Sequence, residues 1–116
     1  MPTIREVFPR GAYDWPSGLA RAIATFRVTP EALQARTGIV LLPGCDELDQ
    51  FRAAGLELVS GRRVLLLWHE RAPVQELVLE ADWADDVLEA RSEAMAALGL
   101  SKAEVSWVPV ADSPAT

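Results

Sequence analysis

The clearest hydrophobic pattern lies in residues 62–80, RRVLLLWHERAPVQELVLE, and it predicts a β-hairpin. Val64–Trp68 is a continuous apolar run, and residues 75–80 interleave apolar side chains with glutamates. The charged break between them contains Pro73, which has no N–H to give to a strand ladder. Because side chains alternate across a strand, we expect these cross-strand pairs: Leu66 with Leu77 and Val64 with Leu79 on one face, and Leu65 with Val78 and Leu67 with Glu76 on the other.

Two short helices are expected in the first third of the chain. Gly18–Phe26 has apolar residues at helical spacing, and Ser17 before it is a suitable N-cap. The second helix has clearer ends, because Thr29 can cap it, Pro30 suits its first turn and Gly38 can end it.

Two more helices are expected further along. One begins at Asp46 and ends at Gly55. The other, Trp83–Leu98, is the longest, with Asp82 as its N-cap and Gly99 as its stop. Trp83 is expected at the head of an apolar stripe that faces the core of the protein.

Three further strands complete the pattern: Ile39–Leu42, Leu56–Val59 and Val105–Val110. The expected class is therefore α+β, an antiparallel sheet with helices on one face. From about residue 38 to 110 the order βαββαβ is that of a ferredoxin-like core. We expect a single domain, 1–116, made of short N-terminal helices (1–36), an α+β core (37–110) and a tail (111–116).

The edges of this sheet are a difficulty for the ferredoxin-like arrangement. It places the last strand at an edge, which suits Pro109. It also makes Val64–Trp68 an edge strand, although that strand is apolar on both faces. Either residues 1–36 or another subunit covers the second face, or the topology differs.

Composition restricts the compartment and the partners. The single cysteine, Cys45, excludes an internal disulfide framework and fits a reducing cytoplasm. No apolar run reaches the roughly 18 residues that span a bilayer, and no secretory signal is visible. Arginine far outnumbers lysine, which we interpret as genomic base bias, and we expect a cytoplasmic bacterial protein.

Charge is unevenly distributed along the chain. Residues 1–43 carry five basic and three acidic side chains, whereas residues 44–116 carry six basic and fourteen acidic ones, and the whole chain has a net charge of −6. The acidic second half repels phosphate groups, so neither nucleic acid nor an anionic membrane is an expected partner. It favours solubility or attraction to a basic protein.

Cys45 and His69 are the candidate catalytic side chains, with Glu76 as a third. Cys45 lies between a strand end and an expected helix start, which can lower a thiol pKa, but three neighbouring acids favour the neutral thiol. His69 could act as a general base with Glu70 or Glu76 nearby, and a Cys45–His69 dyad stays open because distant residues can meet in space. The simpler alternatives are a small unreactive thiol and a histidine at the rim of the sheet. The sequence shows no metal-ligand spacing and no phosphate- or cofactor-binding motif, so no metal or cofactor is expected.

The outer face of the last expected helix is a candidate contact surface. It gathers carboxylates with few cations between them: Asp82, Asp85, Asp86, Glu89 and Glu93. Like charges at this spacing destabilise a helix by a few tenths of a kcal/mol per pair. A stripe that does not stabilise its own helix is explained either by the solubility that it gives the protein or by a basic partner that binds it.

The mixed face of the hairpin is a second candidate surface, with Leu65, Leu67 and Val78. Such a face is an exposed apolar patch unless it is covered. Residues 1–36 could fold over it, or a partner or a second copy of the chain could bind there.

These patterns give two hypotheses about function and identify no family. The first is a non-enzymatic protein-binding module, of an inhibitor, immunity or accessory type, that uses the acidic helix and the apolar sheet face. The second is a small α+β enzyme or ligand-binding protein with a pocket near His69. A homodimer formed through the sheet faces is a further alternative.

Overall fold

In the computed structural model, residues 4–8, 15, 18–45 and 50–109 are described, and they form a seven-stranded antiparallel sheet with two helices. The strands are β1 (Ile4–Phe8), β2 (Ala20–Phe26), β3 (Leu42–Cys45), β4 (Gln50–Leu58), β5 (Arg63–His69), β6 (Leu77–Asp82) and β7 (Val105–Trp107). The helices are α1 (Pro30–Thr37) and α2 (Val87–Leu98), and a short 3-10 helix, η2 (Lys102–Glu104), precedes β7.

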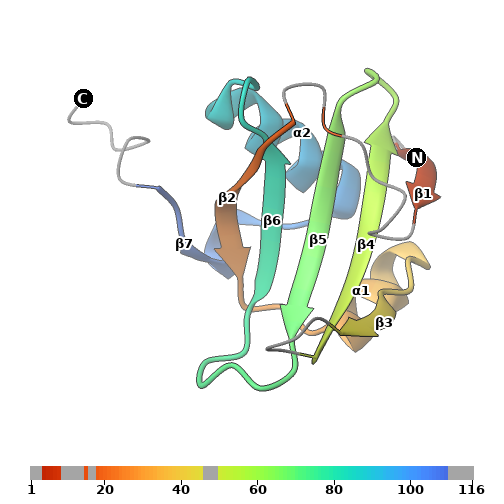
Figure 1. Cartoon of the computed structure of the whole chain (residues 1–116), viewed down its shortest axis with the longest axis vertical. Helices are drawn as coiled ribbons and strands as arrows, with labels where there is room; N and C mark the ends of the chain where they lie inside the picture. The colour runs from red at the N-terminus through yellow and green to blue at the C-terminus, as the bar shows by residue number, and fades with distance from the viewer. Residues whose placement is uncertain (1–3, 9–14, 16–17, 46–49, 110–116) are drawn as a thin grey trace.

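The strand order across the sheet is β1-β4-β5-β6-β2-β7, with β3 also paired to β4. Both helices pack against one face of the sheet, behind the strands in Figure 1. The predicted class, α+β with an antiparallel sheet and helices on one face, is therefore confirmed. The ferredoxin-like order is not found, because β3, β4, β5 and β6 all lie between the two helices.

The central position of β5 resolves the difficulty with its apolar sequence. β5 pairs with β4 on one side and with β6 on the other, and Val64–Trp68 is buried throughout. A strand with neighbours on both sides and packing on both faces needs no polar face. The run of five apolar residues thus belongs to a central strand and not to an edge strand.

The β5–β6 hairpin has the predicted faces and a different register. Leu66 pairs with Leu79 and Leu67 with Val78, a shift of two residues from the expected pairs. The connection is longer than a two-residue turn, and within it the Gln75 side chain donates to the carbonyl of Glu70 at 2.9 Å. A shift of two leaves every side chain on its expected face, because strand side chains repeat every two residues.

Two predicted helices are strands in the structure. Residues 20–26 form β2, where the register with β6 shifts between Ala22 and Ala24, so Ile23, Ala24 and Phe26 are all buried. This bulge breaks the two-residue alternation of buried side chains, so the apolar residues of the strand have a spacing like that of a helix. Residues 50–55 belong to β4, a strand with packing on both faces, while residues 46–49 lie outside the described residues.

The ends of α1 are as predicted, and α2 starts later than predicted. The Thr29 hydroxyl accepts a hydrogen bond from the amide of Ala32, and Gly38 ends α1. α2 begins at Val87, and its N-cap is Asp86 instead of Asp82. At its other end, Gly99 has a φ of 67°, and the amides of residues 99 and 100 both donate to the carbonyl of Met95, as expected of a glycine stop.

The core has two parts, one on each face of the sheet. The larger part lies between the sheet and the helices, and includes Phe26, Leu33, Leu66 and Leu98. The smaller part, on the opposite face, consists of Phe51, Ala53, Leu65 and Leu67, with Trp15 and Val78 packed against it. The last strand is at an edge as predicted, although it covers only Val105–Trp107.

Candidate functional site: an acidic end of the sheet

Three carboxylates of the acidic stripe predicted on the last helix lie close to an arginine from the β4–β5 turn. Arg62 lies 3.0 Å from a Glu93 oxygen, 3.7 Å from one of Glu89 and 4.0 Å from one of Asp85. This cation is far from the helix in sequence, so the helical pattern alone could not reveal it. The stripe is therefore partly neutralised, and it is tied to the β4–β5 turn.

The individual carboxylates differ in their surroundings. Asp82 is buried at the end of β6, and its Oδ1 accepts a hydrogen bond from the amide of Ala84 at 2.8 Å. Burial raises the pKa of Asp85, while the charge of Arg62 opposes that increase. Asp86 accepts from the amide of Glu89 as the N-cap of α2, whereas the Glu89 side chain is 73% exposed. Glu89 is thus an exposed carboxylate of the stripe that a partner can reach.

Trp83 lies outside the core, contrary to the prediction that it heads the buried stripe of the helix. It is in the turn before α2 and is 55% exposed. The guanidinium carbon of Arg21 lies 4.7 Å from the centre of its ring, a cation–π contact, and an Arg21 nitrogen is 3.4 Å from the carbonyl oxygen of Asp85. The amide of Trp83 also donates to the carbonyl of Leu19 at 2.9 Å. The indole is therefore presented at the surface from a fixed backbone.

Leu19 and Val59 are also largely exposed, and both lie at the same end of the sheet as Trp83. Figure 1 shows the start of β2, the β4–β5 turn and the end of β6 together at the upper end. We call this surface the acidic end: it consists of Leu19, Val59, Trp83, Asp85, Asp86, Glu89 and Glu93. It combines apolar contact area with an excess of carboxylates.

The second candidate surface is already occupied within the chain. Leu65 and Leu67 are each 2% exposed, and Trp15 packs against the cluster that contains them. Val78 is partly buried against the same cluster. This placement agrees with the alternative in which the N-terminal part of the chain contributes cover to this face.

The three candidate catalytic residues occupy the opposite end of the sheet. His69 pairs with Phe51, and Cys45 pairs with Gln50 on the neighbouring strand. The side chain of Cys45 is outside the described part of the structure. A cavity of about 390 Å³ lies nearby and is lined by Pro43, Gly44, Gln50, Phe51 and Glu70.

Glu76, directly before β6, forms hydrogen bonds with hydroxyl groups on β2 and β7. Its carboxylate accepts hydrogen bonds from the hydroxyls of Ser106 and Thr25, the latter at 2.8 Å. These bonds, with Ser106 the stronger influence, lower the pKa of Glu76. A carboxylate with a lowered pKa is a weak base near neutral pH, so this arrangement favours a structural role in joining β7 to the sheet.

Among the described residues, no group of three or more histidine, cysteine, aspartate or glutamate side chains is arranged to hold a metal ion. Within the same ranges, no helix is both long and apolar enough to cross a membrane. Comparison of the chain with protein-family models, with curated proteins and with solved structures finds no match.

Proposed function

We propose that this chain is a non-enzymatic protein-binding module and that the acidic end is its contact surface. The observation that carries the proposal is the exposed indole of Trp83 beside Arg21, within a group of carboxylates. Tryptophan and arginine are enriched among the residues that dominate binding energy at protein interfaces. A large indole held at the surface by local contacts is suited to fill a pocket on a partner.

The charge of the acidic end indicates a basic partner. Arg62 faces three carboxylates, so the stripe keeps a negative excess that can attract cations. Such complementarity mainly accelerates association and selects among partners, and the apolar side chains supply contact area. Because exposed charges are screened by salt, the association should weaken as ionic strength rises.

The structure determines which substitutions test this proposal cleanly. Reversal of Asp86 would remove the cap of α2, and Asp85 is partly buried beside Arg62. Trp83→Ala and Glu89→Lys instead change exposed side chains. Trp107→Ala and Glu31→Lys are matched controls, because Trp107 is 46% exposed on β7 and the Glu31 side chain is 71% exposed on α1.

The experiment is an affinity capture from a lysate of the source cells with the tagged wild-type chain and these four variants, read by mass spectrometry. The expected result is a basic protein retained by the wild type and by both controls, and lost with W83A, with E89K and in a 1 M salt wash. Circular dichroism of each variant establishes that its fold is intact. Equal recovery of the same proteins by W83A, E89K and the controls would show that the acidic end is not the contact surface.

A further inference from the structure

A groove on the helix-covered side of the molecule is separate from the acidic end. It has a volume of about 460 Å³ and lies between α2 and the segment that contains η2 and β7. Its lining combines apolar, hydroxyl and cationic side chains: Arg91, Ser92, Met95, Lys102, Val105 and Val108. This volume falls within the range of sites that bind small organic molecules.

The charged side chains that line this groove are basic, although the chain is acidic. Arg91 and Lys102 both line it, although the chain as a whole has a net charge of −6. Burial lowers the pKa of the Arg91 guanidinium, so this group is partly removed from water. An anion beside a partly desolvated cation is attracted more strongly than it would be in bulk water.

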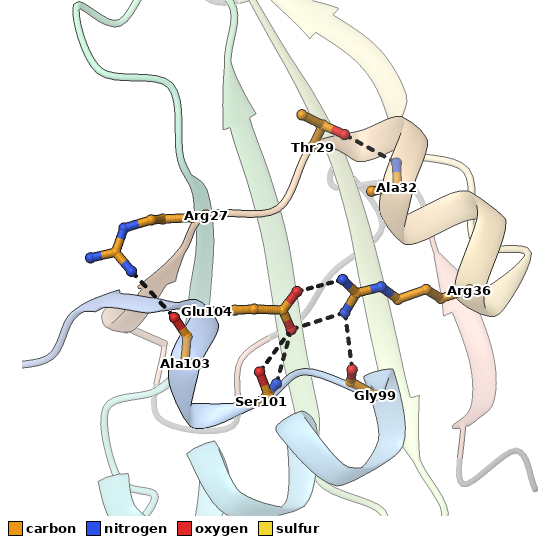
Figure 2. Close-up of polar contacts among 8 residues, drawn as sticks. All are labelled: Arg27, Thr29, Ala32, Arg36, Gly99, Ser101, Ala103 and Glu104. Atoms are coloured by element: carbon orange, nitrogen blue, oxygen red, sulfur yellow. Dashed lines mark hydrogen bonds and ion pairs between the residues drawn. The ribbon is translucent and has the colours of Figure 1, made fainter.

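The wall of the groove that carries Lys102 is held in place by hydrogen bonds. Figure 2 shows Glu104 between the guanidinium of Arg36, on α1, and both the amide and the hydroxyl of Ser101. Arg27 donates to the carbonyl of Ala103 at 3.3 Å on the other side of η2. A site whose walls are fixed before binding loses less entropy when a ligand enters.

We propose that this groove binds a small monocarboxylate with an apolar body. Arg91 and Lys102 place two positive charges at the groove, and both side-chain types form charge-assisted hydrogen bonds with a carboxylate. Met95, Val105 and Val108 provide the apolar lining for the body of the ligand. The net charge of the chain repels polyanions such as nucleic acids more strongly than it repels a single negative charge, which favours a monoanion.

The test is a titration of the ¹⁵N-labelled chain with octanoate, followed by amide chemical shifts, beside a titration with octanol. Octanol has the same apolar body without the charge. The expected result is saturable shifts at the amides of Arg91, Ser92, Met95 and Val105, with octanol at least about tenfold weaker, as expected for the loss of a charge-assisted hydrogen bond. Arg91→Gln and Lys102→Gln should each weaken octanoate binding by about tenfold.

Two controls separate this inference from the proposed protein contact. Arg71→Gln removes an exposed arginine outside the groove, and Trp83→Ala alters the acidic end, so both should bind octanoate as the wild type does. Equal affinities for octanoate and octanol, shifts that map elsewhere, or unchanged binding by both R91Q and K102Q would overturn the proposal. It would also be overturned if the same amides shifted on dilution without octanoate, because a second copy of the chain would then occupy the groove.

Discussion

Glu104 connects three parts of the fold, and its neutralisation should destabilise the protein at neutral pH. Its carboxylate accepts from Arg36 on α1 at 2.9 Å and from the amide and hydroxyl of Ser101 at 3.0 and 3.2 Å (Figure 2). These contacts, with Arg36 the largest influence, lower the pKa of Glu104 from 4.5 to about 2. Glu104→Gln keeps the shape of the side chain and removes its charge.

The magnitude follows from that pKa. At ~1.36 kcal/mol per pH unit, a change from 4.5 to about 2 corresponds to at most ~3.4 kcal/mol of folding free energy. The Glu104 side chain is 22% exposed, so solvent screening reduces this figure. We expect E104Q to lower the free energy of unfolding by about 2 kcal/mol at pH 7. With a typical urea dependence, the unfolding midpoint should fall by roughly 1–2 M.

The sign of the pH dependence provides the sharper test. A carboxyl with a lowered folded-state pKa stabilises the protein fully above its unfolded-state pKa, and this contribution is lost as the pH falls. The difference between the wild type and E104Q should therefore be largest above about pH 5 and disappear as the pH approaches 2. Urea unfolding followed by far-ultraviolet circular dichroism at pH 7, 4 and 2.5 measures it.

The control for this experiment is Glu31→Gln, which alters a carboxylate that is 71% exposed and bonded to Arg52 at 2.8 Å. It should lower the midpoint much less than E104Q does, because an exposed ion pair contributes little to the free energy of unfolding. A wild-type stability equal to that of E104Q at pH 7, or a difference that persists undiminished at pH 2.5, would refute the stabilising role of the Glu104 carboxylate.

Four further single substitutions test the packing and the N-cap of α2 by urea unfolding. Leu66→Ala, in the centre of β5, should lower the free energy of unfolding by about 2–5 kcal/mol. Its control, Leu88→Ala on the exposed side of α2, should change that free energy by less than about 0.5 kcal/mol. Similar losses in the two variants would contradict the assigned core. Asp86→Ala should cost about 1 kcal/mol through the lost cap of α2, and an unchanged midpoint would argue against that cap. Gly44→Ala would place a methyl group 2.7 Å from the Phe51 ring and should lower the free energy of unfolding by about 1–3 kcal/mol. The double variant with Phe51→Leu should recover part of this loss. No recovery would argue against the contact.

The sequence predicted best those features that depend on neighbouring residues. The ends of α1 and the glycine stop of α2 are local, and both were correctly placed from Thr29, Gly38 and Gly99. The faces of the β5–β6 hairpin were also correct, because alternation fixes them whatever the length of the connection. The register depends on that connection and was two residues out.

Features that depend on distant residues could not be predicted in this way. The bulge in β2 follows from pairing with β6, and the small residues Ala53 and Ala54 favour a helix in isolation but are buried between strands in β4. At the candidate site, Arg62 reaches the acidic stripe from a turn about thirty residues before Glu93. Trp83 lies in the turn before α2 and not in the helix that was expected to bury it. The positions of Arg62 and Trp83 both depend on tertiary contacts, which helical periodicity in the sequence cannot reveal.

The strand order also has a consequence for how the chain reaches this fold. β4, β5 and β6 are consecutive and adjacent, so this meander can assemble from nearby residues. β2 is synthesised early but pairs with β6 and β7, which come after α1 and three other strands. While the chain is emerging from a ribosome, β2 therefore lacks both partners, and the apolar run of β5 lacks β6 beside it. We expect a slow late step in which β2 joins the meander, and a susceptibility to aggregation until that step is complete.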